Sequence, residues 1–306
     1  MPSVMTVTGP IEPAQLGATY AHEHLLAAPP DWSPDQEDQD FNMLSFETAV
    51  KELGLFKLAG GRAIVEMSPP DYNRRPEGLR DLATQTGVHI IMTTGLHKDV
   101  FSHPFTAQAT TDELAERFRQ EVTQGVAESG VKAGIIKAAT SLNTITSGEE
   151  KVLRAAARAH LATGAPISTH TQNGTMGLEQ LDIFQAEGVD LTRVALGHVD
   201  RKLEYEYHKA MLDRGAYLIY DQISKEKYVA DRDRVSLLIQ LVAEGYGRQI
   251  MLAGDFGRAS YWTSYGGGPG LTYILWRFVP WLIADGMPRE MAEAMLVGNP
   301  ATFFAF

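Results

Sequence analysis

Two histidines separated by one residue stand at the end of the first apolar run of the chain, in the segment Ala21-His22-Glu23-His24-Leu25. Side chains alternate across a β-strand, so His22 and His24 would point to one side of this strand and Glu23 to the other. Two imidazoles on the same side of a strand end can hold one divalent ion between them. A His-x-His pair alone is weak evidence for a metal site, because most such pairs lie on a surface or in a core.

Further candidate ligands stand at the ends of later apolar runs, and four of the nine histidines of the chain occupy such positions. The C-terminal ends of strands converge on one mouth when parallel strands close into a barrel. The pattern therefore predicts a metal site at that mouth, built from His22, His24, Lys137, His170, His198 and Asp255.

Lys137 is the unusual member of this set, because it lies in the otherwise apolar run Ala133-Gly134-Ile135-Ile136-Lys137-Ala138. A buried lysine is costly unless it is paired or chemically changed. One interpretation is a salt bridge to Glu66 or Asp255. The other is that the amine has reacted with carbon dioxide, because the resulting carbamate is an anionic ligand whose two oxygens can bridge two metal ions.

The elements that must position these residues alternate along the chain. Eight short apolar runs, each followed by a helical pattern, predict parallel β/α units and hence a (β/α)8 TIM barrel that takes up residues 1–306 as one domain. The expected strands are residues 18–26, 63–67, 88–95, 133–138, 166–170, 194–198, 216–221 and 250–255.

A short hairpin cap over residues 6–15 is expected before the barrel, with Gly9-Pro10 as its turn. Thr110 and Glu113 could form the capping box of a long helix, and Ser147 and Glu150 that of the next one. The last helix should begin at Pro288 and stop at Gly298-Asn299-Pro300. The other expected helices are residues 45–60, 74–86, 202–214, 229–246 and 271–283.

The composition excludes several classes of protein. The formal net charge of −11 and the lack of a basic stripe argue against binding to nucleic acid or to an anionic membrane. No apolar stretch approaches the roughly 18 residues of a membrane span, and no secretory signal is visible, so a cytoplasmic protein is expected. Because the chain has no cysteine, any metal must use histidine, carboxylate or related oxygen ligands. Positive charge for an anionic substrate would have to be local.

The order His-x-His, lysine at the fourth strand, His, His, Asp resembles the amidohydrolase superfamily. The segments Val7-Thr8-Gly9-Pro10-Ile11, Ala21-His22-Glu23-His24 and Ala133-Gly134-Ile135-Ile136-Lys137 are similar to the phosphotriesterase-like family within it, over essentially the whole chain. The resemblance implies two divalent ions, usually zinc, with manganese or cobalt as alternatives, and a homodimer.

In that family's arrangement, His22, His24 and Asp255 would hold one ion and His170 and His198 the other. Carboxylated Lys137 and a hydroxide would bridge the two ions, which lower the pKa of the bridging water and polarise the electrophilic group. Asp255 would also be the catalytic residue that carries the proton to the leaving oxygen.

The loops must determine the substrate, since fold and metals are common to phosphotriesterases and lactonases of this family. Gly95-Leu96-His97 departs from the Gly-Phe-Tyr of acyl-homoserine lactonases, whereas Lys227, Arg258 and Tyr261 resemble the phosphate-binding trio of the phospho-furanose lactonase branch. A guanidinium, an ammonium and a phenol suit a phosphate dianion. Alternatively, Lys227 and Arg258 are surface charges.

The resemblance thus implies a hydrolase that opens a phosphorylated sugar lactone. A lactonase or phosphotriesterase for uncharged esters is the first alternative, and a non-catalytic barrel that binds a small ligand is the second. Four further polar residues are expected to have supporting or structural roles: Glu23, His97, His103 and Asp200.

Overall fold

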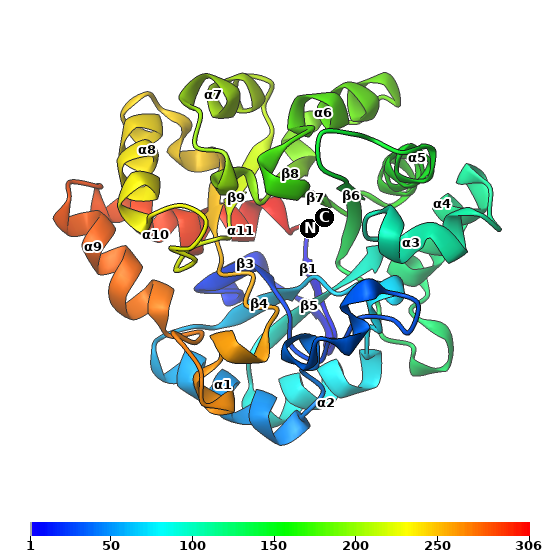
Figure 1. The fold of residues 1–306 in the computed structure, drawn as a ribbon, viewed down its shortest axis with the longest axis horizontal. Helices are drawn as coiled ribbons and strands as arrows, with labels where there is room; N and C mark the ends of the chain where they lie inside the picture. Colours follow the sequence, from blue (N-terminus) through cyan, green and yellow to red (C-terminus); the bar gives the residue numbers. More distant parts are fainter. Residues whose placement is uncertain (1) are drawn as a thin grey trace.

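Eight parallel strands surround the central axis of the molecule and helices cover their outer side, as Figure 1 shows. The computed structural model describes residues 2–306. Each strand pairs with the next one along the chain, in the order β3 to β10, so the predicted (β/α)8 barrel is confirmed. The strands are β3 (Thr19–Glu23), β4 (Ala63–Glu66), β5 (His89–Gly95), β6 (Ile135–Thr140), β7 (Ile167–Thr171), β8 (Val194–Gly197), β9 (Tyr217–Tyr220) and β10 (Ile250–Leu252).

The helices follow the strands as the sequence predicts. They are α1 (Phe46–Leu58), α2 (Pro76–Thr86), α3 (Asp99–Thr106), α4 (Thr111–Thr123), α5 (Ser147–Thr163), α6 (Gly177–Ala186), α7 (Tyr205–Asp213), α8 (Asp231–Ala243), α9 (Val279–Ala284), α10 (Arg289–Leu296) and α11 (Gly298–Phe303). Among residues 2–306, no helix combines the length and the apolar character that a membrane span requires.

Glu23 joins the first and last strands of the barrel. Its buried carboxylate accepts hydrogen bonds from the backbone N–H groups of Gly254 (2.7 Å) and Phe256 (2.8 Å). The N–H of Asp255 donates to the carbonyl of His22 at the same seam, at 3.1 Å. Glu23 therefore has the structural role that the sequence predicts, and it fixes β3 relative to the segment that carries Asp255.

A hairpin of β1 (Val4–Thr6) and β2 (Gly9–Ile11) packs at one end of the barrel. The prediction of a hairpin cap is confirmed, but the predicted turn is wrong. Thr6 pairs with Gly9, so residues 7–8 form the turn, and Pro10 lies in the strand opposite Met5. A two-stranded sheet has only edge strands, which tolerate a proline without an N–H.

Several helix boundaries differ from the predictions. The expected helix 271–283, for example, is a π-helical segment, Ile274–Phe278, followed by α9. The capping box of α5 uses Thr146 and Glu149, one residue earlier than expected, while that of α4 uses Thr110 and Glu113 as predicted. The segment from Gly298 does not end the chain's helical structure. It forms α11, in which Pro300 occupies the first turn, where a missing N–H costs little.

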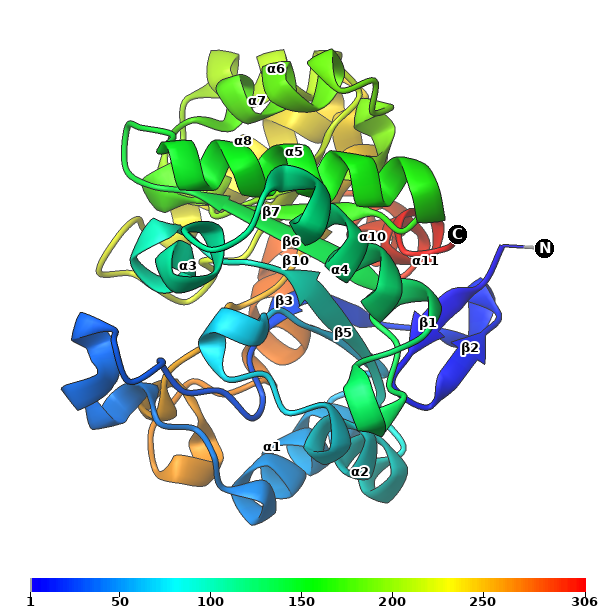
Figure 2. The same cartoon turned by 90° about the vertical axis from the view of Figure 1, so that its right-hand side faces the viewer.

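Figure 2 shows the barrel from the side, with the hairpin and both termini at one end. The loops that follow the strands lie at the other end, including the segment of residues 24–45 after β3 and the segment of residues 253–273 after β10. This second end is the mouth of the barrel.

Candidate active site

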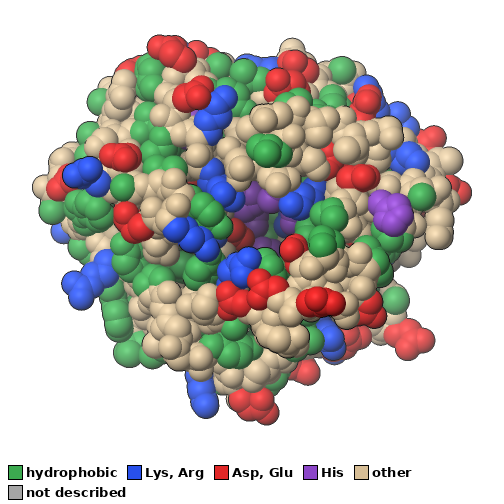
Figure 3. Space-filling view, viewed as in Figure 1, with side chains coloured by type: hydrophobic (Ala, Val, Ile, Leu, Met, Phe, Trp, Pro, Cys, Tyr) green, Lys and Arg blue, Asp and Glu red, His purple; other side chains and the backbone are tan. Residues whose placement is uncertain are grey.

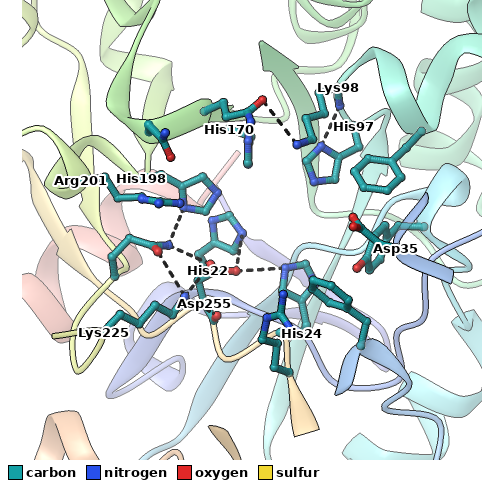
Figure 4. A pocket seen from close by; sticks show the side chains of 18 of the residues that line it. His22, His24, Asp35, His97, Lys98, His170, His198, Arg201, Lys225 and Asp255 are labelled. Atoms are coloured by element: carbon teal, nitrogen blue, oxygen red, sulfur yellow. Dashed lines mark hydrogen bonds and ion pairs between the residues drawn. The ribbon is translucent and has the colours of Figure 1, made fainter. Parts of the chain in front are cut away.

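The mouth contains a cavity of about 230 Å³ that is lined by all six predicted metal-site residues. In Figure 3, histidine side chains are visible at the bottom of this hollow, and Lys and Arg side chains surround it. Figure 4 shows that His22, His24, His170, His198 and Asp255 point toward one another. The structure thus brings together residues that are far apart in the sequence.

His22, His24 and Asp255 form one group of potential ligands. The Asp255 Oδ1 atom lies 3.3 Å from His24 Nε2 and 3.8 Å from His22 Nε2. One ligand atom from each of the three residues lies within 4.8 Å of the other two, which suits a single divalent ion. His22 Nε2 is buried and has no hydrogen-bond partner among residues 2–306. The lone pair of this nitrogen is therefore free to bind a metal.

The backbone at two of these strand ends is strained. Asp255 has φ 45° and His198 has φ 61°, in the left-handed region that non-glycine residues rarely adopt. Each such residue costs about 1–3 kcal/mol, and they occur mostly at functional sites. Next to them, a Cβ on Gly257 would lie 2.9 Å from the His24 ring, so glycine is needed there for close approach.

His170 and His198 lie together on the opposite side of the cavity floor. Their ring centroids are 4.4 Å apart, and His170 Nε2 is buried without a hydrogen-bond partner in the described part of the chain. Burial lowers the pKa of His22 to about 4 and holds the pKa of His170 well below its usual range. These imidazoles are therefore neutral near pH 7, which is the form that binds metal.

Asp221 was not predicted as a functional residue, although it directly follows β9. Its Oδ1 atom lies 2.8 Å from His198 Nδ1 and accepts the His198 N–H at 3.0 Å. Its Oδ2 atom lies 3.0 Å from His22 Nδ1. A carboxylate on the Nδ1 side of an imidazole fixes the ring and leaves Nε2 for a metal. The only signal in the sequence was a carboxylate at the end of an apolar run.

Lys137 lies at the centre of the floor and is 1% exposed. Its Nζ donates to the carbonyl of Met67 at 2.7 Å, and it forms no ion pair with Glu66 or Asp255. The salt-bridge interpretation is therefore wrong for this structure. Burial lowers the pKa of Lys137 to about 8, although the carboxylates of Asp255 and Asp71 oppose this shift. An appreciable neutral fraction of the amine, which reaction with carbon dioxide requires, follows from that pKa.

Asp255 is held on its second oxygen by two side chains. Lys225 Nζ donates to Oδ2 at 2.7 Å, and Gln222 Nε2 donates to the same atom at 2.8 Å. Burial favours the protonated acid, but the charge of Lys225 and the contact with His24 hold the pKa of Asp255 well below its usual range. The carboxylate is therefore ionised and fixed in orientation.

The predicted phosphate-binding residues are only partly at the cavity. Arg258 and Tyr261 line it, whereas Lys227 stands at its edge with Nζ 5.3 Å from the Tyr261 ring centroid. Lys225, two residues earlier, lines the cavity instead and contacts Asp255. Arg258 is paired with Asp38 (2.9 Å) and Asp40 (3.2 Å) from the loop after β3.

His97 and Asp200 have the supporting roles that the sequence predicts, whereas His103 does not. His97 lines the cavity, with its ring centroid 4.7 Å from that of His170. Asp200 is buried below β9, where it accepts the Gln222 N–H at 2.9 Å and pairs with Arg234 at 2.9 Å. His103 is exposed on α3.

Residues 2–304 match the phosphotriesterase family. The chain belongs to this family. The family is metal-dependent and its members are hydrolases. This agrees with two overlapping groups that could hold a metal in this chain: His22, His24 and Asp255, and His22, His198 and Asp221.

Individual members of the phosphotriesterase family are similar over nearly the full length. The phosphotriesterase homology protein of Escherichia coli is 38% identical over 289 residues, covering 94% of this chain and 98% of that protein. A phospho-furanose lactonase of Mycoplasmopsis synoviae is 33% identical over 324 residues, covering 98% of this chain and 91% of the relative.

Solved structures that are 36% identical to this chain have the same fold. A lactonase from Listeria monocytogenes superposes with a TM-score of 0.95 at 36% identity, covering 99% of this chain and 98% of that one. The structure of the E. coli phosphotriesterase homology protein, complexed with phosphate in its active site, gives a TM-score of 0.90 at 36% identity, with 95% and 99% covered.

Proposed function

We propose that this protein is a binuclear metal-dependent lactonase that opens a phosphorylated sugar lactone. The observation that supports the proposal best is the convergence of four imidazoles, three of them buried, with Asp255 and Lys137 below a rim of Lys and Arg side chains. The −11 charge of the whole chain makes a cationic rim unusual, and it suits an anionic substrate. The phospho-furanose lactonase relative and the phosphate in the E. coli structure support the same substrate class.

The residues fit the implied metals by their chemistry. His22, His24 and Asp255 would hold one ion, and His170 and His198 the other, with Lys137 as a bridging ligand after carboxylation. Two such ions, zinc by family resemblance or else manganese or cobalt, would supply an activated water and polarise the lactone carbonyl.

The side chains of the protein would then move the proton. Asp255 is ionised, so it can accept a proton and pass it to the ring oxygen that leaves as an alcohol. Gln222 and Lys225 hold its Oδ2 atom, which leaves Oδ1 on the side of His22 and His24. Asp221 and Ser68 would keep His198 and His24 in place, through contacts of 2.8 and 2.7 Å to their Nδ1 atoms.

At the rim, Arg258, Tyr261 and Lys227 would bind the phosphate. Arg258 and Lys227 could both reach an anion above Tyr261, since both side chains are near this phenol. The binding energy of this remote group can hold the carbonyl over the metals, so it should raise kcat as well as lower KM.

The test uses matched sugar lactones with and without the phosphate. Arg258→Ala should cost about 2–5 kcal/mol on the phosphorylated substrate, and Lys227→Ala should cost less because Lys227 is exposed. Both should cost little on the other lactone. Arg232→Ala, an exposed arginine on α8, is the control. Equal losses on both lactones would mean that these residues shape the pocket in general. Indifference of the wild type to the phosphate would favour a lactonase or phosphotriesterase for uncharged esters.

A second test concerns the proton. Asp255→Asn should leave the barrel folded but lower the rate by roughly 10²–10⁴-fold. Near-normal kcat in this variant would refute the role of Asp255.

A chain that binds metal but hydrolyses no lactone or ester would instead be a ligand-binding barrel. The homodimer, the cytoplasmic location and the single domain stay predictions.

A further inference from the structure

Two cations that line the cavity have no part in the site described above. Lys98 follows β5 and Arg201 follows β8, and both contribute to the cavity wall together with Gln172 and Asn173, which follow β7. The sequence did not single out any of these four residues. Their position at the mouth gives them access to the same ligand as the metal site.

Neither cation is neutralised by the protein. Lys225 is paired with Asp255 and Arg258 with Asp38 and Asp40, whereas no carboxylate oxygen among residues 2–306 lies within 4.0 Å of Lys98 or Arg201. Lys98 Nζ has one weak contact, 3.4 Å to Gln172 Oε1. Asp35 also lines this cavity, but neither cation has a carboxylate within ion-pair distance, which favours an anionic ligand.

The surroundings hold both side chains in place. The Arg201 guanidinium stacks on the Tyr228 ring, 3.7 Å from its centroid, and Lys98 Nζ lies 5.6 Å from the Phe101 centroid. Stacking uses the face of the guanidinium and leaves the N–H donors in its plane for a ligand. Burial lowers the pKa of Lys98, and the charge of Arg201 lowers it further against the opposing carboxylates of Asp35 and Glu149. An anion bound between Lys98 and Arg201 would offset the repulsion between their charges.

This wall lies away from Arg258, although Arg201 stacks on the same Tyr228 ring that Lys227 Nζ approaches at 4.9 Å. In the order of the barrel, β6 and β7 lie between β5 and β8, and they are the strands farthest from β10 and β3. Arg258 belongs to the segment after β10. Figure 4 shows Lys98 and Arg201 on either side of His170, whereas Lys225 and His24 lie on the other side of the pocket.

We infer that Lys98 and Arg201 form a second anion subsite, which binds a carboxylate or phosphate on the end of the ligand remote from Arg258. The inference rests on the proposed function for the reaction itself. It narrows the substrate class to lactones that carry two anionic groups, one for each wall.

The direct test measures binding of two unreactive probes to the metal-loaded protein by calorimetry in phosphate-free buffer. The probes are a pentitol 1,5-bisphosphate and the matching pentitol 5-phosphate. The wild type should bind the bisphosphate roughly 10- to 100-fold more tightly, the scale of hydrogen bonds to charged groups. Lys98→Gln and Arg201→Gln should each remove most of this advantage and leave the affinity for the monophosphate nearly unchanged.

Lys202→Gln is the matched control. Lys202 is the next residue after Arg201, but it pairs with Glu204 at 3.4 Å and does not line the cavity. This variant should keep the full preference for the bisphosphate. Since Lys98 and Arg201 are partly exposed, their glutamine variants should fold, and thermal melts would verify this.

Three results would overturn the inference. These are equal affinity of the wild type for both probes, an unchanged preference in the Lys98 and Arg201 variants, or an equal loss for both probes, which would mean that all these cations bind one phosphate. The probes contain no lactone, so the result does not depend on catalysis. A preference for the bisphosphate without lactonase activity would refute the proposed function alone, and lactonase activity without that preference would refute the subsite alone.

Discussion

Asp221 uses its two oxygens on two different histidines, and its removal should therefore disturb both proposed metal positions. Asp221→Asn keeps the size of the side chain but removes the charge beside His22 Nδ1 and His198 Nδ1. Outer carboxylates of this kind typically contribute 10–100-fold to metal affinity. We expect a loss of that size for the second, weaker ion, measured by competition with a chelator. Asp213→Asn, an exposed carboxylate on α7, should bind metal as the wild type does; equal affinities in all three proteins would contradict the role of Asp221.

Lys137 offers a test of the bridging ligand. Lys137→Ala should lose most of its metal and activity, because alanine has neither an amine nor a carbamate. The position is 1% exposed in the wild type, so no other side chain of the surface can take its place. Short carboxylic acids should restore part of both, since they can replace the two oxygens of a carbamate. Metal analysis and mass spectrometry of the native protein check the assignment. Full activity with one ion per chain and an unmodified lysine would be incompatible with it.

The residues proposed as ligands could be expected at one mouth from the sequence because a strand end is a local feature. His22, His24, Lys137, His170 and His198 each follow or end an apolar run, and the barrel topology then brings them together. The other contacts could not be predicted in this way. Whether Lys225 or Lys227 faces the cavity depends on the path of one loop, and Asp221 acquires its role only when His22 and His198 are next to each other.

At the scale of elements, the loop of residues 24–45 forms one wall of the mouth and competes for Arg258. Asp38 and Asp40 pair with the Arg258 guanidinium, which also stacks on Phe41 at 3.7 Å. A substrate phosphate at Arg258 must share or displace these carboxylates. The contact joins residues about 220 positions apart in the sequence, so no local sequence pattern predicts it.

Asp38→Asn should therefore strengthen the use of phosphorylated lactones. Asp38 is partly exposed, so the gain should be modest, on the order of 0.2–1 kcal/mol. The variant should lower KM for the phosphorylated substrate and leave an uncharged lactone unaffected. Asp40 is less suitable, because it also accepts the N–H and the hydroxyl of Ser260. Asp31→Asn, in the same loop, is the control. An unchanged or higher KM in Asp38→Asn would show that the pair supports the loop rather than opposing the substrate.

At the scale of the whole molecule, the chain separates its charges. The surface is acidic overall, with a net charge of −11, while Lys98, Arg201, Lys225 and Arg258 line the mouth. The positive potential of such a mouth attracts anions. Salt screens this attraction, with a Debye length of about 10 Å at 0.1 M ionic strength. An anionic substrate is therefore compatible with the acidic exterior, because the cations of the cavity act on it at short distance while salt screens the more distant surface charges.

His208 links the stability of the molecule to pH. It is fully buried under β9, where Nδ1 contacts the Tyr220 hydroxyl at 2.8 Å and Nε2 lies 2.9 Å from the Lys202 carbonyl. Burial lowers its pKa from the usual value of 6.5 to about 4, although the carbonyls of Lys202 and Val199 oppose this. The unfolded chain therefore binds this proton at higher pH than the folded protein does. Stability should fall as the pH decreases from about 6.5 to about 4.

Replacing His208 should remove one of the protons that the chain takes up on unfolding in acid. His208→Gln should be less stable at pH 7, because two buried contacts are changed, but its free energy of unfolding should decrease less steeply below pH 6.5. The difference in slope approaches about 1.4 kcal/mol per pH unit for one proton. Urea unfolding of chelator-treated proteins between pH 4 and 7 measures it, since His22 and His170 then contribute equally to both. His103→Gln, on the exposed side of α3, should have the wild-type slope. Parallel curves for His208→Gln and the wild type would mean that His208 does not contribute to the acid sensitivity.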